Sequence, residues 1–325
     1  MKAIYRYMDW LSDQYRVDPR FLAILRVAYA LWVLLLPTDY LWVRGVPEAF
    51  FQPRMGPIRL FSEIPPDGVL VGLQVAAAVL AALLAVGFRT RLVSVLLAVL
   101  MILGSGIVYS FGKVDHFILF ELLPIAMAVA GWGARFSVDS WLRRRVGRTM
   151  PSSSGFPVLL WGMVVGFALF SAALPKAMTG WLDPARHATR GYLAREVADP
   201  KRVGAVGSWV FQFDSDILWK AVDYGTLLAE GGLIFALLYP LLYRLWLVMI
   251  LAFHVSVYLT MGISFAGYVF VYLPFFGMPI MIAVGWLRRR SSRPDHKSSG
   301  PSPVRNSVSS NAVSTYGAAP DTVPR

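Results

Sequence analysis

The sequence contains no cysteine and carries little charge. Only 15% of its 325 residues are charged, whereas soluble domains usually contain about 25%. Without cysteine the chain has neither a disulfide framework nor a metal site built from thiolates. The HExxH and GxSxG motifs of metalloproteases and serine hydrolases are also missing. These absences leave no sequence signature of a soluble hydrolase, and no metal is expected.

Hydrophobic residues, in contrast, make up 57% of the chain and are gathered in long runs. A helix of roughly 20 apolar residues crosses the ~30 Å hydrocarbon layer of a bilayer. Eight runs meet or approach this length, at residues 21–36, 69–87, 92–109, 117–132, 156–174, 224–239, 245–260 and 266–286. The sequence therefore predicts an all-α fold, a polytopic transmembrane bundle of about eight helices with the lipid bilayer as its main partner.

The chain has a net charge of +12, but its basic residues flank the apolar runs instead of forming one basic domain. This arrangement argues against a nucleic-acid partner and for contacts with lipid headgroups. With the N-terminus inside, the inner segments hold 19 Lys and Arg and the outer segments 11, seven of them in residues 175–223. The positive-inside rule thus predicts a protein of the cell membrane with both termini cytoplasmic.

The apolar runs divide the chain into three parts. We expect a cytoplasmic segment at residues 1–20, a transmembrane domain at residues 21–287 and a cytoplasmic tail at residues 288–325. The tail is basic and rich in Ser, Pro and Gly. Such a composition cannot bury a core, so it predicts disorder.

The outer segment at residues 175–223 contains one predicted helix. Asp183 can cap its first turn, and Pro184 suits the first helical position. We therefore expect this helix to begin there and to end at about Val197.

Two pairs of glycines in the apolar runs have the spacing that lets transmembrane helices approach closely. These pairs are Gly68/Gly72 and Gly162/Gly166. The spacing predicts tight helix packing at both places.

Ionisable residues inside the predicted spans are costly to bury, so each needs a structural or functional reason. Arg26, five residues into its run, is predicted to snorkel to the headgroups or to join an ion pair. Glu121 and Glu230 lie deeper and must be paired or protonated. His254 stands in the middle of its run, and Tyr258 should face the same way. An interhelical hydrogen bond and a role in proton transfer both remain open for His254.

Three further polar residues stand at the outer ends of predicted spans. Asp115 and His116 precede the fourth run, and Lys176 follows the fifth. Taken singly, they are ordinary loop residues or an interfacial anchor. Taken together, His116, Lys176, Arg26 and Glu230 are predicted to line one outward-facing cavity.

Six motifs follow one another in the order of a known family. They are DPRFLAILRVAYALW at 18–32, GFRTR at 87–91, KVDHFILFELL at 113–123, RFSVDSWL at 135–142, PKAMTGWLDP at 175–184 and FHVSVYLTMGISF at 253–265. In this order the chain resembles the HTTM (horizontally transferred transmembrane) family over about residues 18–285. The best-known member of that family is the vitamin K-dependent gamma-glutamyl carboxylase.

The resemblance implies a carboxylase-like activity, that of a carbon–carbon lyase that depends on a quinol. In the carboxylase a membrane-embedded lysine acts as the base on vitamin K hydroquinone. The oxygenated quinone then deprotonates glutamate, and the carbanion captures carbon dioxide. By resemblance the catalytic residues are Lys176 and His116. The residues expected to bind a lipid-soluble, vitamin K-like quinol are His254, by resemblance, and Glu230 and Arg26, as members of the predicted cavity.

The chain also departs from the carboxylase pattern. Pro175-Lys176 stands where the carboxylase has two lysines, and only a short tail follows the last apolar run. Carboxylation guided by a propeptide is therefore not expected, and the substrate is predicted to be a peptide or small molecule at the outer face. Two other functions remain open: a non-catalytic membrane partner in the maturation or export of a secreted peptide, and a small-solute transporter.

Overall fold

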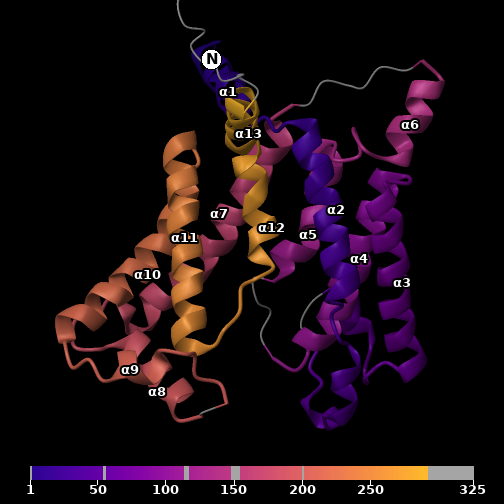
Figure 1. The fold of residues 1–325 in the computed structure, drawn as a ribbon. Coiled ribbons are helices and arrows are strands. Elements are labelled where there is room, and N and C mark those ends of the chain that lie inside the picture. Colours follow the sequence, from indigo (N-terminus) through magenta and orange to yellow (C-terminus); the bar gives the residue numbers. More distant parts are fainter. Residues whose placement is uncertain (1, 54–55, 113–116, 148–153, 200, 292–325) are drawn as a thin grey trace, which may run out of the picture. The chain divides into compact units, whose positions relative to one another are not determined.

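The computed structural model of the chain describes residues 2–53, 56–112, 117–147, 154–199 and 201–291. Over these residues every regular element is a helix (Figure 1), which confirms the predicted all-α fold. Residues 1–283 form one compact unit. Of the second unit, residues 284–325, the structure describes only the continuation of the last helix to Ser291. The predicted disorder of the tail falls almost entirely outside the described residues.

The helices follow the predicted apolar runs closely. They are α1 (Lys2–Gln14), α2 (Pro19–Leu35), α3 (Asp67–Val86), α4 (Thr90–Tyr109), α5 (Ile118–Ala130), α6 (Val138–Arg145), α7 (Phe156–Lys176), α8 (Ala188–Val197), α9 (Gly207–Phe211), α10 (Asp216–Ala236), α11 (Pro240–Met261), α12 (Tyr268–Tyr272) and α13 (Gly277–Ser291). Each of the eight predicted runs lies on helix: α2, α3, α4, α5, α7, α10, α11 and the α12–α13 segment.

Five segments within the described residues are long and apolar enough to cross a membrane. They are Asp67–Val86, Thr90–Tyr109, Phe156–Trp181, Pro240–Met261 and Tyr268–Leu287. Helices α2 and α5, with 17 and 13 residues, are shorter, and α10 carries four charged residues. The chain is therefore a multi-pass membrane protein, while the count of eight spans stays a prediction.

The helices of the first unit form two groups (Figure 1). Helices α2, α3, α4 and α5 pack in chain order, and α7, α10 and α11 form the second group. Helix α5 contacts α7, and α12 contacts α5. Buried rings of Tyr29, Phe120 and Phe270 meet here, with centroids 4.6 to 5.9 Å apart, and join α2, α5 and α12.

Glycines allow α7 and α10 to lie in direct contact. A Cβ atom added at Gly166 would lie 2.9 Å from Cα of Ile234, and one at Gly162 would lie 2.6 Å from Cδ1 of Leu237. The predicted close packing is confirmed at this pair. At Gly68 and Gly72 an added Cβ atom would meet nothing within 4 Å. The same spacing therefore marks no contact there within the described chain, and the packing predicted for that pair is wrong.

The helix of the long outer segment begins later than predicted. Helix α8 ends at Val197 as expected, but it begins at Ala188 and not at Pro184. The carboxylate of Asp183 accepts a hydrogen bond from the backbone amide of Ala185, at 3.0 Å, and closes a separate turn. Asp183 therefore stabilises the turn that precedes α8 and does not cap the helix.

Candidate functional site

Lys176 and Glu230 form an ion pair between α7 and α10. Lys176 is the last residue of α7, and Glu230 lies in the C-terminal half of α10. Both carboxylate oxygens lie 2.5 Å from Nζ of Lys176. The side chain of Glu230 is 8% exposed and that of Lys176 is 28% exposed. A buried carboxylate requires such a partner because desolvation of an unpaired charge is costly.

The chain after Lys176 makes one turn of π-helix, Ala177–Trp181, which is interrupted at Thr179 and Gly180. Gly180 has a φ of 94°, which favours glycine. The hydroxyl of Thr179 donates to the carbonyl of Pro175 at 2.8 Å. The turn brings the indole ring of Trp181 to 5.4 Å from Nζ of Lys176.

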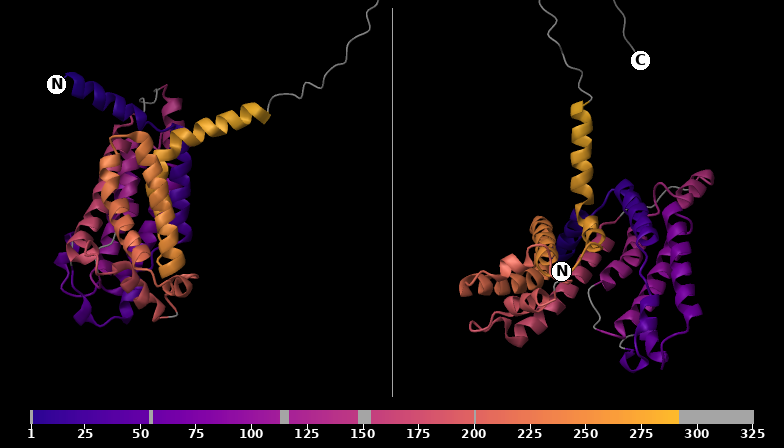
Figure 2. Two further views of the ribbon diagram at one scale, coloured as in Figure 1. Left: turned by 90° about the vertical axis from the view of Figure 1, so that its left-hand side faces the viewer. Right: turned by 60° about the horizontal axis from the view of Figure 1, so that its bottom comes forward.

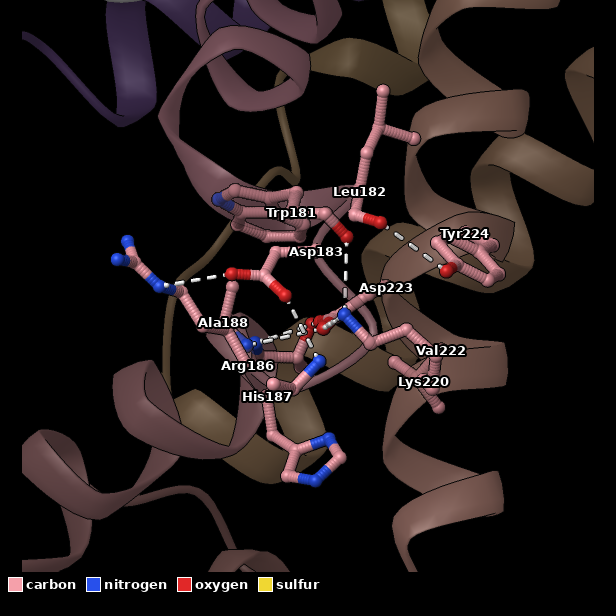
Figure 3. Close-up of polar contacts among 12 residues, drawn as sticks. Trp181, Leu182, Asp183, Arg186, His187, Ala188, Lys220, Val222, Asp223 and Tyr224 are labelled. Carbon is pink, nitrogen blue, oxygen red and sulfur yellow. Dashed lines mark hydrogen bonds and ion pairs between the residues drawn. The ribbon is translucent and has the colours of Figure 1, made fainter.

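A second charged pair lies two turns earlier on α10 (Figure 3). Asp223 is fully buried, and it accepts a hydrogen bond from Nζ of Lys220 at 3.1 Å. Its two oxygens also accept the backbone amides of Ala188 at 3.0 Å and of Thr189 at 2.8 Å. Asp223 therefore caps the N-terminus of α8 from another helix.

Lys220 connects this pair to the π-helical turn. Its Nζ also donates to the carbonyl of Trp181 at 3.1 Å (Figure 3). The Lys220–Asp223 pair thus fixes the residue whose indole ring lies next to Lys176. The two charged pairs of α10 form one connected site with the turn between α7 and α8.

The hydrogen bonds around Asp223 also determine its protonation. Burial alone would raise the pKa of this carboxyl, but hydrogen bonds from Thr189, Lys220 and Ala188 outweigh burial and hold it below its ordinary value of 3.8. Asp223 is therefore a carboxylate at neutral pH.

Four arginines and His187 around the site have acidic partners of their own. The pairs are Arg186–Asp183, His187–Asp216, Arg190–Asp214, Arg195–Glu196 and Arg202–Asp199. Most of the positive charge of residues 175–223 is therefore neutralised locally.

With the geometry described, comparison with known proteins identifies the family. The family model for the HTTM domain matches residues 15–286, most of the chain. The chain belongs to the HTTM family. No curated protein and no solved structure is similar enough to match it. The predicted family is thereby confirmed.

Arg26 of this HTTM protein does not join the pair of Lys176 and Glu230. Its fully buried guanidinium donates to backbone carbonyls of the α5–α6 connection and of α3: Trp132, Arg135, Phe136 and Ala85. Helices α6 and α8 lie at opposite ends of the first unit (Figure 1). Arg26 therefore neither snorkels nor lines a cavity with Lys176, and those two predictions are wrong. Its partners are carbonyl oxygens because the last turn of α3 and the non-helical connection after α5 leave carbonyls without helical partners around it.

His254 lies in an aromatic environment between α11 and α12. Its Nε2 atom is 3.0 Å from the hydroxyl of Tyr272, and its ring stacks on Phe265 at 4.2 Å. The interhelical hydrogen bond left open by the sequence is thus present. Tyr258 is 54% exposed, although it follows His254 by four residues. The spacing places both residues on one side of α11, but only His254 is buried there.

Of the three remaining predicted residues, the structure describes only Glu121. Glu121 is fully buried in α5. His116 and Asp115 lie outside the described residues, so the predicted catalytic role of His116 stays a prediction.

The sequence analysis missed Trp181, Lys220 and Asp223. One signal was present: Asp223 precedes Glu230 by seven residues, two helical turns, so both lie on one face of α10. The apolar run begins at residue 224, so Asp223 was assigned to the preceding segment, residues 175–223, and not to the helix.

Proposed function

We propose that this HTTM protein is a membrane enzyme that begins its reaction by proton transfer at the Lys176–Glu230 pair. The acceptor of the proton is Lys176, and its donor is the hydroxyl of a lipid-soluble quinol. The observation that supports this proposal is the asymmetric burial of the pair. Glu230 is almost fully enclosed at 8% exposure, whereas Lys176, at 28%, keeps an accessible side.

A lysine can act as a base only when it is neutral. In the pair, Nζ of Lys176 can pass one proton to the carboxylate of Glu230, which leaves a neutral amine and a neutral carboxylic acid. When a bound ligand excludes water, this transfer removes two buried charges and their desolvation cost. The amine of Lys176 then accepts the proton of the quinol hydroxyl. Glu230 is thus the group that holds the first proton.

The surroundings of Lys176 fit a quinol headgroup. Leu174, Met178 and Leu182 precede and follow Lys176 with exposed side chains, Met178 at 79%. Cofactor sites combine an apolar lining with a few placed polar groups, and in this proposal these side chains supply the apolar contacts beside Lys176. A bound quinol would supply the oxidisable ring, and the protein supplies the base and the orientation.

The Lys220–Asp223 pair has a positioning role in this proposal. Because Nζ of Lys220 holds the carbonyl of Trp181, the indole ring keeps its place next to Lys176. By resemblance to the carboxylase, the activity extends to formation of a carbon–carbon bond with carbon dioxide. Its substrate is a peptide or small molecule at the outer face.

The proposal is tested first by binding and then by turnover. The full chain is purified in lipid nanodiscs, and its extract is analysed for quinones by mass spectrometry. Reduced menaquinol is then added in the presence of oxygen, and its oxidation is followed by absorbance. We expect a co-purified quinone and oxidation above that of empty nanodiscs. Neither signal would be obtained from a non-catalytic maturation partner or from a solute transporter.

A further inference from the structure

Helix α1 has one apolar and one charged face. The apolar side chains recur at intervals of three and four residues: Ile4, Tyr7, Met8 and Leu11. The charged side chains lie on the opposite face: Lys2, Arg6, Asp9 and Asp13. A short helix with this pattern is typical of the membrane surface and not of a span.

Only the C-terminal part of α1 is packed against the protein. Leu11 is 1% exposed, whereas Ile4, two turns earlier on the same face, is 67% exposed. The hydroxyl of Tyr7 donates to the carbonyl of Leu238 at 2.7 Å, and that of Tyr15 donates to the carbonyl of Leu237 at 2.8 Å. Figure 2 (left) shows α1 extending away from the end of the bundle. Its first two turns therefore have an apolar face that the described chain does not cover.

The position at which α1 contacts the rest of the protein indicates which partner covers its apolar face. Leu237 and Leu238 form the turn between α10 and α11. A Cβ atom added at Gly155, directly before α7, would lie 1.8 Å from the carbonyl oxygen of Ser12. Helix α2 begins at Pro19, only five residues after α1 ends. Helix α1 is thus attached where long apolar helices begin or turn, which is the level of the lipid headgroups.

We propose that α1 lies in the headgroup layer, with Ile4 and Met8 turned toward the acyl chains. Exposed Tyr5 and Trp10 are suited to this layer, because Tyr and Trp rings prefer the membrane–water interface. Helix α1 carries two basic and two acidic side chains. Apolar burial therefore drives its association with lipid, and anionic headgroups are not required.

The absence of cysteine makes a direct test possible, because any introduced cysteine is the only thiol. Ile4→Cys reports the apolar face, and Arg6→Cys is its matched control on the charged face. Each full-length variant carries a nitroxide label and is placed, one copy per disc, in phosphatidylcholine nanodiscs. Collisions with oxygen, which concentrates in acyl chains, are compared with collisions with a water-soluble nickel chelate. We expect an oxygen-to-nickel ratio several-fold higher at position 4 than at position 6. Met8→Cys and Asp9→Cys repeat the comparison one turn later.

Equal ratios on the two faces would overturn the proposal. A difference that appears only with two copies per disc would also overturn it, because a second copy would then cover the face. A difference that requires added phosphatidylglycerol would overturn the apolar mechanism. None of these outcomes depends on the proposed enzymatic function.

Discussion

The carboxylate of Asp223 on α10 accepts a hydrogen bond from the backbone amide of Ala188, the first residue of α8, at 3.0 Å. Helix N-termini leave several amides without partners, and a carboxylate there is also stabilised by the helix dipole. In most helices a residue directly before the first turn provides this cap. Here the cap comes from a position 35 residues later. The connection between α7 and α10 is therefore held to the membrane helices at the point where the candidate site lies.

Asp223→Asn should lower the free energy of unfolding by about 1–2 kcal/mol, because asparagine has one acceptor oxygen where both oxygens of Asp223 accept backbone amides, and it has no charge to pair with Lys220. The effect should depend on pH. The pKa of Asp223 is lowered in the folded protein, so its stabilisation is complete above its ordinary value of 3.8 and is lost as the pH falls through the folded value. Unfolding in detergent at several pH values measures both effects. Asp214→Asn, in an exposed pair with Arg190, is the control; equal losses in the two variants would contradict the capping role.

Arg26→Lys should destabilise the protein by about 2–4 kcal/mol, because lysine cannot reproduce the planar fork that reaches several carbonyls. The guanidinium holds the α5–α6 connection against α3. Thermal unfolding of the purified protein is the measurement. Arg91→Lys, at an exposed position of α4, should have almost no effect. If Arg26→Lys unfolds like the unchanged chain, the carbonyl contacts do not stabilise the fold.

Gly166→Ala should separate α7 from α10, since its Cβ atom would lie 2.9 Å from a backbone atom of Ile234. We expect a loss of about 1–3 kcal/mol from overpacking. Gly72→Ala in α3 is the matched control, because nothing lies within 4 Å of its added Cβ atom. That change should be neutral or stabilise α3 by up to about 1 kcal/mol, the difference in helix propensity. Equal stability of the two variants would show that α7 and α10 tolerate separation.

The positions of the membrane helices were predictable because each is marked by a run of apolar residues in one stretch of sequence. Close packing at Gly162 and Gly166 was also predictable, because their spacing places both on one helix face. The identical spacing of Gly68 and Gly72 marks no contact within the described chain. The spacing therefore shows that one face of a helix carries small residues. It does not show whether another helix packs against that face.

The polar contacts were harder to predict because their partners are distant in sequence or belong to the backbone. The sequence predicted a lipid headgroup or an acidic side chain as the partner of Arg26. The guanidinium instead donates to backbone carbonyls, which the folding of the chain brings next to it. Lys176 and Glu230 were both identified as candidates, yet their direct pairing depends on the packing of α7 on α10. Asp223 was missed because it caps a helix to which it has no local relation.

We predict eight membrane spans with both termini in the cytoplasm, although only five described segments meet the length and hydropathy of a span. The further spans are the apolar runs at residues 21–36, 117–132 and 224–239, whose helices α2, α5 and α10 are short or carry charge. Reporter fusions at Gly147 and Ser299 should show a cytoplasmic location, and one at Asp199 an outer location. An outer signal at Ser299 would rule out the eight-span arrangement, since an even number of spans returns the chain to its starting side.

Lys176→Arg distinguishes a catalytic base from a structural ion pair. Arginine keeps the positive charge and can pair with Glu230, so folding and membrane insertion should be unchanged. Arginine does not lose its proton, so quinol oxidation should fall by about a hundredfold or more, the usual contribution of a general base. Arg202→Lys, which changes a paired basic residue of the same outer loop, is the control and should retain activity.

The double variant Lys176→Glu with Glu230→Lys completes this test. The exchange restores opposite charges between α7 and α10, so a purely structural pair should tolerate it and the protein should unfold as the unchanged chain does. It also places the amine at the enclosed position, which is 8% exposed, and the carboxylate at the accessible one. If Lys176 is the base, activity should remain lost although stability is recovered. Full quinol oxidation in either variant would exclude Lys176 as the base and would leave the pair with a structural role alone.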